Sequence, residues 1–488
     1  MMALLLLLSG ALQMTATEHP KRALRGVWIA TVTNIDWPSK PGLPDEQQKK
    51  ELIDMFDEVA AYNMNTVILQ IRPTADAFYR SQLEPSSHWL TGKQGAALNY
   101  DPLQFAIDEC HKRGLNMHVW LNPYRINTDT TKMTDYASTH IYRQHPEWFV
   151  TYGKAAYFNP ALDEVRGFIN QVVAEIVTNY DIDAIHMDDY FYPYKIKGIE
   201  FPDEEAWQKY PRGFTNKEDW RRNNVNLIIK EVNSTIKQIK PWVEFGISPF
   251  AIWRNKTEDP RGSETKAMTN YDGLYADILT WQEKGWIDYV LPQLYFNIGY
   301  AIADYAVLAD WWSKYNYGAN VYAGLAPYRV SKKAKQKEWH SSKELVKQIQ
   351  RNKLDPNLKG EIFFNARTMF RPEVDLKKRL TKHEYKYKTI SPENNRIARI
   401  EAEQPLDAMM TVSNEVVFSW KRGENAKRFV IYKLKKGKPV DLNNPANIVT
   451  VTGETSFRIS KKDYDPSYRY GITSLSPSHS ESSFVSFE

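Results

Sequence analysis

Short apolar runs of strand length alternate with longer amphipathic runs of helical period along residues 25–365. This alternation is typical of parallel βα units, in which each strand is followed by a helix that crosses back over the sheet. The predicted strands cover residues 25–32, 65–73, 116–124, 183–191, 243–250, 288–296, 320–328 and 361–367. The clearest helical segments between them cover residues 47–63, 102–114, 162–180, 223–239 and 342–353.

Eight such repeats predict an α/β fold of the (β/α)8 TIM-barrel type. The alternative is a doubly wound open sheet, which would carry fewer strands and usually a glycine-rich phosphate loop after the first strand. The residues after the first predicted strand, TNIDWPSK, contain no glycine. The pattern therefore favours the barrel.

Within the predicted strands, apolar and polar side chains alternate with a period of two. Gln70 and Arg72 face away from the apolar residues of the second strand, and His186 and Asp188 do so in the fourth. In a barrel, one side of each strand packs against the helices and the other side faces the interior. The polar side chains gather toward the C-terminal strand ends, where barrel enzymes carry their sites. We therefore expect a ligand site at this end.

A different pattern follows the barrel, with short alternating runs, turn clusters between them and no helical period. The runs cover residues 413–420, 427–436, 447–454, 455–461 and 468–476. They predict a small all-β, immunoglobulin-like sandwich over residues 390–488, after a barrel domain at residues 21–389. The aromatic residues on these strands resemble the pattern of a fibronectin type III module: Trp420, Tyr432, Tyr468 and Tyr470. Such a module serves as a spacer that holds the barrel at a distance, or as a surface for a partner protein of the envelope.

Residues 1–20 form a separate segment with an apolar core, Leu4 to Leu8, followed by small residues. The pattern is typical of a cleaved secretory signal, although no Lys or Arg precedes the apolar run. Because the run is far too short to cross a bilayer, we expect no transmembrane segment. The prediction is an exported protein of the periplasm or cell envelope.

Composition removes several classes of function. The 64 basic and 59 acidic side chains nearly balance, so no strong electrostatic field favours nucleic acid or lipid as a ligand. The single cysteine, Cys110, cannot form an intramolecular disulfide. Aromatic residues make up 13% of the chain, which is high for an ordinary domain and excludes disorder.

The strongest candidate for chemistry is the run HMDDYFYPY at the end of the fourth predicted strand. Strand alternation directs Asp188 into the mouth of the barrel, while Asp189 begins the loop. A carboxyl group at this position suits the cleavage of sugars, because an acid must protonate the glycosidic oxygen or a carboxylate must stabilise an oxocarbenium-like centre. The alternative is an aspartate pair that caps the following turn.

Glycoside hydrolysis normally uses a second carboxyl group. The fifth and seventh strands end in SPFAIW and AGLAPYR, which contain no acid. We favour Asp76, after the second strand, as a catalytic partner because the nearby Arg72 is suited to orient a carboxylate. Asp36 and Asp272, in other loops, are the alternatives.

Further predicted substrate-binding residues follow the strand ends. Hydrogen-bonding side chains for sugar hydroxyls and acid groups come from Asp36, Arg72, Asn122, Tyr124, Gln293, Tyr295 and Asn365. Flat rings for pyranose faces come from Trp37, Tyr190 and Trp253. The ten histidines show no H-E-x-x-H spacing, so we expect no metal and no cofactor, with a metal-dependent deacetylase as a minor alternative.

Six segments on these strand ends together resemble the bacterial glycosyl-hydrolase-like family ten. They are RGVWIATVTNIDWP, ILQIRPTADAFY, HVWLNPYR, IHMDDYFYP, GISPFAIWRN and PQLYF, within about residues 25–371. The resemblance implies a secreted TIM-barrel glycoside hydrolase of the envelope that acts on peptidoglycan glycan strands lacking stem peptides. It also places Asp188 and Asp189 in the acidic motif of the family, and Asp76, Arg72 and Gln293 in adjoining site motifs.

The leading hypothesis is an exported glycoside hydrolase that cleaves an amino-sugar polymer by carboxyl acid/base catalysis, with Asp188 as the essential carboxylate and Asp189 or Asp76 assisting. Its partner is the polysaccharide, with no role for nucleic acid. If a second acid is absent, the N-acetyl group of the substrate is a recognised substitute nucleophile. Two alternatives remain open. One is a non-catalytic glycan-binding envelope protein, and the other is a hydrolase of another polysaccharide.

Overall fold

The computed structural model describes residues 19–131 and 136–488. Eight parallel strands close a barrel in the order β1-β11-β10-β9-β8-β7-β3-β2, which confirms the predicted fold class and excludes an open doubly wound sheet. The strands are β1 (Leu24–Ile29), β2 (Thr66–Arg72), β3 (Asn116–Leu121), β7 (Ala184–Met187), β8 (Glu244–Ile247), β9 (Tyr289–Val290), β10 (Asn320–Leu325) and β11 (Leu358–Phe363). Each of them overlaps one of the eight predicted strand segments.

The start of the described chain is tied to the C-terminal domain. Lys21 pairs with Glu481 at 2.5 Å between Nζ and Oε2. Residues 1–18 of the predicted signal-like segment lie outside the described residues. In the part of the chain that the structure describes, no helix combines the length and the apolar character that crossing a membrane requires.

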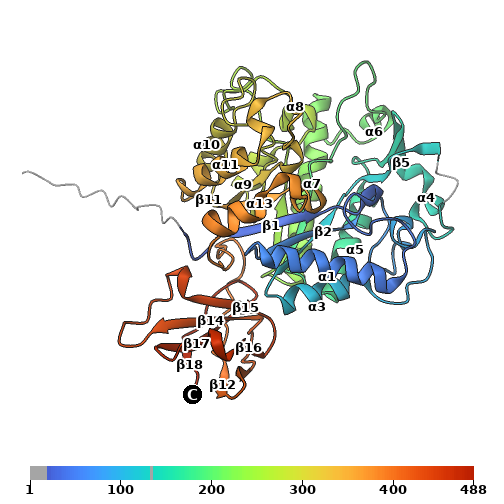
Figure 1. Cartoon of the computed structure of the whole chain (residues 1–488). Helices are drawn as coiled ribbons and strands as arrows, with labels where there is room; N and C mark the ends of the chain where they lie inside the picture. The colour runs from blue at the N-terminus through green and yellow to red at the C-terminus, as the bar shows by residue number, and fades with distance from the viewer. Residues whose placement is uncertain (1–18, 132–135) are drawn as a thin grey trace, which may run out of the picture.

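Helices surround the barrel (Figure 1). The five predicted ones are α1 (Asp45–Ala61), α3 (Pro102–Lys112), α5 (Asp163–Asn179), α7 (Lys217–Ile239) and α11 (Lys343–Lys353). The sequence did not predict α9 (Ile278–Glu283) and α10 (Tyr305–Lys314), which are short for a clear helical period. Shorter helices lie among the connections: α2 (His88–Thr91), α4 (Ile141–Gln144), α6 (Glu204–Lys209), α8 (Asn270–Gly273), α12 (Ala366–Met369) and α13 (Leu376–Arg379).

Local signals determine where the main helices begin. At the start of α3, the side chain of Asp101 accepts the backbone N–H groups of Leu103 and Gln104, and Pro102 occupies the first turn. Asn216 caps α7 in the same way. These caps satisfy N–H groups that have no partner within the helix, and they mark in the sequence where each helix can start.

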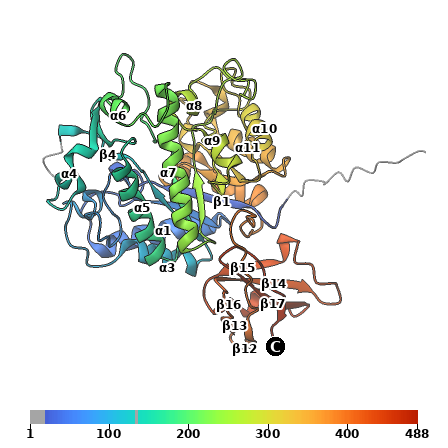
Figure 2. The same ribbon diagram turned by 180° about the vertical axis from the view of Figure 1, so that it is seen from behind.

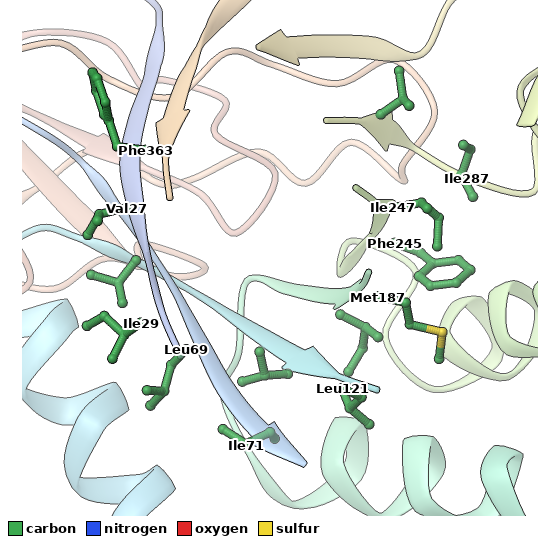
Figure 3. Close-up of a cluster of buried hydrophobic side chains, with 14 of the residues drawn as sticks. Val27, Ile29, Leu69, Ile71, Leu121, Met187, Phe245, Ile247, Ile287 and Phe363 are labelled. Carbon is green, nitrogen blue, oxygen red and sulfur yellow. The ribbon is translucent and has the colours of Figure 1, made fainter. Parts of the chain in front are cut away.

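The side chains of the barrel strands divide between two layers, as the period-two pattern predicted. Figure 3 shows residues such as Val27 and Leu69 on the outer side of the strands, where they form the main hydrophobic core with the helices. The interior holds a second cluster that includes Trp28, Trp120 and Tyr289. Part of the aromatic excess therefore fills the barrel itself.

A three-stranded antiparallel sheet is inserted between β3 and α5. Its strands, in the order β4-β6-β5, are β4 (Arg125–Asn127), β6 (Ala155–Phe158) and β5 (Phe149–Tyr152). They are too short to stand out in the sequence. The sheet holds Arg125 at the C-terminal strand ends, where its backbone N–H donates to Asn122 Oδ1 at 2.8 Å and its Nη2 donates to the Pro73 carbonyl at 3.2 Å.

The C-terminal domain consists of two antiparallel sheets. One contains β12 (Leu406–Val412), β13 (Glu415–Lys421) and β16 (Ser456–Ser460), and the other contains β15 (Ile448–Thr452), β14 (Arg428–Lys435), β17 (Tyr468–Leu475) and β18 (Val485–Ser486). Trp420 and Phe418 lie in the core between them. The Tyr470 hydroxyl accepts the backbone N–H of Asp465 at 3.2 Å, as in the tyrosine corner of immunoglobulin-like domains. Its identity as a fibronectin type III module stays a prediction.

This sandwich packs against the N-terminal face of the barrel (Figures 1 and 2). Arg428 Nη2 donates to Asp183 Oδ1 at 2.6 Å, Lys427 lies 3.1 Å from the same oxygen, and both partners of the first pair are buried. Gly114 lies so close to the backbone of Val451 that an added Cβ would stand 2.4 Å from the carbonyl oxygen. The sandwich therefore packs directly on the base of the barrel, where its basic residues pair with Asp183. Its predicted role as a spacer or as a surface for a partner protein stays a prediction.

Candidate active site

Asp188 lies directly after β7, at the C-terminal end of the barrel. Its Oδ2 accepts Trp120 Nε1 at 3.0 Å, Asn122 Nδ2 lies 3.2 Å from both oxygens, and the backbone N–H of Tyr190 donates to Oδ1 at 3.2 Å. The register explains this meeting, because Trp120 is paired with His186 and the next inward residues of the two strands are Asn122 and Asp188. Three donors therefore hold one buried carboxyl group in a single orientation.

Burial raises the pKa of Asp188 above its ordinary value, against the positive charge of Arg125 and the three hydrogen bonds. The Arg125 guanidinium lies 5.3 Å from the centre of the Tyr190 ring. The charge of Arg125 and the three hydrogen bonds favour the carboxylate form of Asp188 and oppose the effect of burial. Asp188 is therefore the member of the acidic pair whose surroundings are built for a negative charge.

Asp189 has different surroundings. Its carboxyl group accepts a short hydrogen bond from the Tyr194 hydroxyl and also bonds to the side chain of Gln293. Burial, and then the negative charge of Asp188, raise the pKa of Asp189 to about 7. At neutral pH a large fraction of Asp189 therefore carries a proton. Two adjacent carboxyl groups with unlike surroundings are an arrangement that can separate an acid from a charged partner.

A buried hydrogen-bond network supports the pair from below. His186 lies one layer deeper, with Nδ1 2.9 Å from the Tyr289 hydroxyl and Nε2 2.9 Å from Ser248 Oγ. Burial, and then the neighbouring His118, lower the pKa of His186 well below its ordinary value, so the ring is neutral. Tyr289 crosses the interior because Gly246 leaves room, since a Cβ there would stand 1.9 Å from the tyrosine ring. This network holds the side chains of the barrel interior in place beneath the acidic pair.

Aromatic rings form the wall that faces the pair. Tyr295 stacks on Phe364 with ring centres 6.0 Å apart, and Tyr328 meets Tyr295 edge-on at 5.8 Å. Trp28 packs against Phe364 at 5.9 Å, and Tyr328 is 40% exposed. Tyr295 follows β9, which lies two strands from β7 in the barrel order, so the wall begins near the strand end that carries the pair. Flat rings at this position suit the apolar faces of sugars.

The structure brings together six of the predicted site residues: Asp188, Asp189, Asn122, Tyr190, Gln293 and Tyr295. Sequence reasoning missed several neighbours: Trp28, Trp120, Arg125, Tyr194, Tyr328 and Phe364. Trp28 and Trp120 occupy inward positions of the strand pattern, and Tyr194 belongs to the HMDDYFYPY run, so these three carried a signal. Tyr328 falls at the end of a predicted strand but lies in a short 3-10 helix after β10, and Arg125 lies beyond the predicted end of its strand.

The other predicted acids have local partners. Asp76 is buried, and it accepts Thr74 Oγ1 at 3.1 Å and Gln94 Nε2 at 3.3 Å. Asp36 accepts the backbone N–H groups of Ala30 at 2.7 Å and Arg367 at 2.8 Å. Burial raises the pKa of Asp36 to about 6. These contacts join loops to one another and do not reach the pair.

Arg72 is engaged in a different pair from the predicted one. Its Nη2 donates to Glu84 Oε1 at 2.6 Å, with both side chains almost wholly buried. Its Nη1 donates to the backbone carbonyl of Asn122 at 2.6 Å. A register irregularity between Gln70 and Arg72 accompanies this arrangement. Arg72 therefore positions the segment that carries Asn122.

Four further predicted residues have structural contacts. Trp37 is fully buried and donates to the Gln48 carbonyl at 2.9 Å, and Tyr124 is fully buried in the core. Trp253 stacks on Trp311 with ring centres 5.9 Å apart. Asn365 caps α12 through Thr368. These side chains hold the loops of the C-terminal face, and the contacts named here do not involve the acidic pair.

Cavities open among the loops of the same face. One of about 430 Å³ lies by the loop after β7 and includes Tyr192, and one of about 300 Å³ lies among the loops after β2 and β3 and includes Trp89. Another, of about 740 Å³, lies between residues 79–98 and 139–148, and its lining does not include Asp188. The chemistry of the pair, rather than the volume of a cavity, locates the candidate site. In the described ranges, no group of three or more His, Cys, Asp or Glu is arranged to hold a metal.

Comparison with known proteins shows the family of this chain. The family model described as glycosyl hydrolase-like 10 matches residues 23–341. The chain is 47% identical over 382 residues to glycosyl hydrolase YngK of Bacillus subtilis (strain 168), and the alignment covers 78% of this chain and 75% of the relative. It is 38% identical over 387 residues to glycosyl hydrolase DigH of Escherichia coli (strain K12), and this alignment covers 75% of this chain and 88% of the relative. The matched region contains the strand ends that carry the acidic pair.

Proposed function

Because this chain belongs to the glycosyl hydrolase-like 10 family, we propose that it hydrolyses the glycosidic bonds of an amino-sugar polymer, namely peptidoglycan glycan strands without stem peptides. The acidic pair carries this proposal, because its two carboxyl groups have the unlike surroundings that acid catalysis requires. The aromatic wall supports a sugar ligand. We also propose export to the cell envelope, where such strands occur.

In the proposed reaction, Asp189 is the general acid. It donates its proton to the glycosidic oxygen as the bond between that oxygen and the anomeric carbon breaks. Asp188 stays a carboxylate, and its charge stabilises the positive character that develops on the sugar ring. The donors Trp120 and Asn122 keep Asp188 in place, so it needs little reorganisation during the reaction.

The test of this function is product analysis with the full chain. Glycan strands are prepared with and without their peptides, and released fragments are identified by mass spectrometry. We expect soluble oligosaccharides with new reducing ends from the bare strands and far fewer from the peptide-bearing ones. Binding of the bare strands without any released fragment would instead support a glycan-binding protein. Cleavage only of unrelated polysaccharides would contradict the proposed substrate.

The pH dependence of cleavage follows from the acid role of Asp189. We expect kcat/KM to fall on the alkaline side with an apparent pKa of about 7, because the proton on Asp189 is lost above that value. Burial raises the pKa of the neighbouring tyrosine hydroxyls and lowers that of His186, so none of these groups titrates near neutrality. The charged and titratable groups around Asp189 are Asp188, Arg125, Tyr190, Tyr194 and Tyr295. The measurement is a pH–rate profile on bare strands.

Tyr194→Phe tests the assignment of that limb. The Tyr194 hydroxyl donates to Asp189, which favours the carboxylate and lowers the pKa of Asp189 relative to the same site without it. Its removal is therefore expected to move the alkaline limb to higher pH. A limb that stays in place would show that another group titrates there.

A further inference from the structure

Asp188 and Asp189 are the acidic residues of the candidate site at the C-terminal end of the barrel. After the other strands, the chain places Asn122, Ser248, Gln293, Tyr328 and Asn365, none of which is acidic, and the loop acids Asp36 and Asp76 are held by their own partners. Among the described residues, the hydrogen bonds that Tyr190 and Tyr194 donate to carboxyl groups go to Asp188 and Asp189 themselves. The site therefore shows no third acid beside the two that are adjacent in sequence.

The two acids also come from the same side of the barrel. In the closed order of eight strands, β11 lies four strands from β7 in either direction, so it stands opposite the pair. That opposite side carries Phe364, with Trp28 and Tyr295 packed against its ring. A two-carboxylate glycosidase places its acids on either side of the scissile bond, about 5 Å apart or more. At the strand end opposite the pair, the chain therefore carries an aromatic ring and not a second carboxylate.

Asp188 is suited to a role other than that of a nucleophile. A carboxylate offers about four lone-pair sites, and three donors already occupy Asp188. About one site remains for a donor from the substrate. An amide N–H beside the anomeric carbon would meet this requirement, and the methyl group of the same amide would pack against the rings of the opposite wall.

From these observations we infer that the nucleophile is the 2-acetamido group of the substrate, so that the sugar on the non-reducing side of the cleaved bond must be a β-linked N-acetylated hexosamine. This inference rests on the proposed function and adds the substrate group that the chemistry requires. Substrate-assisted hydrolysis of this kind is a recognised exception to the two-carboxylate scheme.

The step balances with the residues present. The acetamido carbonyl oxygen attacks the anomeric carbon while the glycosidic bond breaks, and the proton of Asp189 passes to the leaving oxygen. The Asp188 carboxylate accepts a hydrogen bond from the amide N–H, whose nitrogen becomes positive in the cyclic oxazolinium intermediate. Asp189, now ionised, takes a proton from water, and the water oxygen attacks the anomeric carbon and reopens the ring. The acetamido group is restored, and the product keeps the β configuration.

The test varies the N-acyl group of one substrate. Bare glycan strands are de-N-acetylated, re-acylated with acetyl, fluoroacetyl, difluoroacetyl or trifluoroacetyl groups, and incubated with the full chain. We expect the rate to fall with each added fluorine, by about 100-fold or more for trifluoroacetyl, because fluorine weakens the carbonyl oxygen as a nucleophile. Each tenfold fall in rate corresponds to an increase of 1.36 kcal/mol in the activation free energy. Free-amine strands are expected to stay intact, and NMR of early product is expected to show the β anomer.

The outcomes separate this inference from the proposed function. Equal rates across the acyl series, an inverted product, or a sugar ester on an aspartate would overturn the inference while leaving glycan hydrolysis intact. No cleavage of the acetylated strands would contradict both.

Two variants test the roles of the pair. On an aryl glycoside with a good leaving group, Asp189→Asn is expected to keep its rate within about 10-fold of the unaltered chain, because the leaving group needs no proton. Asp188→Asn is expected to lose activity on that substrate too. If both variants fail alike on the aryl glycoside, the division of roles is wrong.

Discussion

Asp188→Asn is expected to lower kcat/KM for cleavage of bare glycan strands by about 1,000-fold, at the upper end of the loss caused by removing one preorganised electrostatic group. The substitution keeps the size of the side chain but removes the negative charge that faces the developing positive centre. It keeps one oxygen to accept Trp120 Nε1 or the Tyr190 N–H. The measurement is the initial rate of reducing-end formation, with the melting temperature of the same sample.

Two further variants make this result decisive. Asp407→Asn, in the exposed Asp407–Lys421 pair of the sandwich, is expected to leave the rate unchanged. Trp120→Phe removes one donor to Asp188 without touching its charge, and we expect a smaller loss of about 10-fold, as for a single hydrogen bond to a charged group. A folded Asp188→Asn variant that cleaves at the normal rate would refute the assignment. A Trp120→Phe variant with no loss would refute the positioning of Asp188.

Arg428→Met is expected to lower the free energy of unfolding by about 3–5 kcal/mol, because it leaves the buried carboxylate of Asp183 without its main partner. Asp183 also accepts the backbone N–H of Met117 at 2.8 Å, so this ion pair joins the sandwich to the first residues of β3 and β7. Arg428 Nη1 donates to the Leu115 carbonyl at 3.0 Å as well. Chemical denaturation followed by tryptophan fluorescence measures the loss.

A matched variant separates this effect from the loss of any arginine. Arg458→Met removes an exposed pair with Glu415 in the same domain, and we expect a change of at most about 1 kcal/mol. Equal losses in the two variants would contradict a special role for the buried pair.

The Asp183 pair also predicts a pH dependence of stability. Burial alone would raise the pKa of Asp183, but the charges of Arg428 and Lys427 and the hydrogen bond from His111 hold it well below its usual range. A depressed carboxyl pKa contributes stability above the unfolded value of about 3.9, and the contribution is lost as the pH falls below it. The difference between the unaltered chain and Arg428→Met is therefore expected to persist from neutral pH to about pH 4 and to shrink below that. A difference that disappears already at pH 6 would point to a histidine instead.

Strand direction alone predicted which side chains meet at the acidic pair, while their roles stay predictions. Asn122, Asp188 and Gln293 follow strands whose alternation points them inward, and the structure gathers them. Strand direction was less informative for Trp37, Tyr124 and Trp253, which lie in loops. Whether a ring in a loop faces a cleft or the helix layer depends on how the loop packs, and these three rings are buried among side chains far away in the sequence.

The sequence by itself determined the barrel, the main helices, the second all-β domain and the strand end that carries Asp188 and Asp189. These features rest on local periods and caps, which are properties of neighbouring residues. Only the tertiary structure decided that Arg72 pairs with Glu84, that rings stand opposite the pair, and that Arg428 closes the base of the barrel on Asp183. Each of these depends on contacts between segments far apart in the chain, where no local period relates one partner to the other. The unlike surroundings of Asp188 and Asp189 belong to the same group, because the donors and charges around each carboxyl group come from segments far apart in the chain.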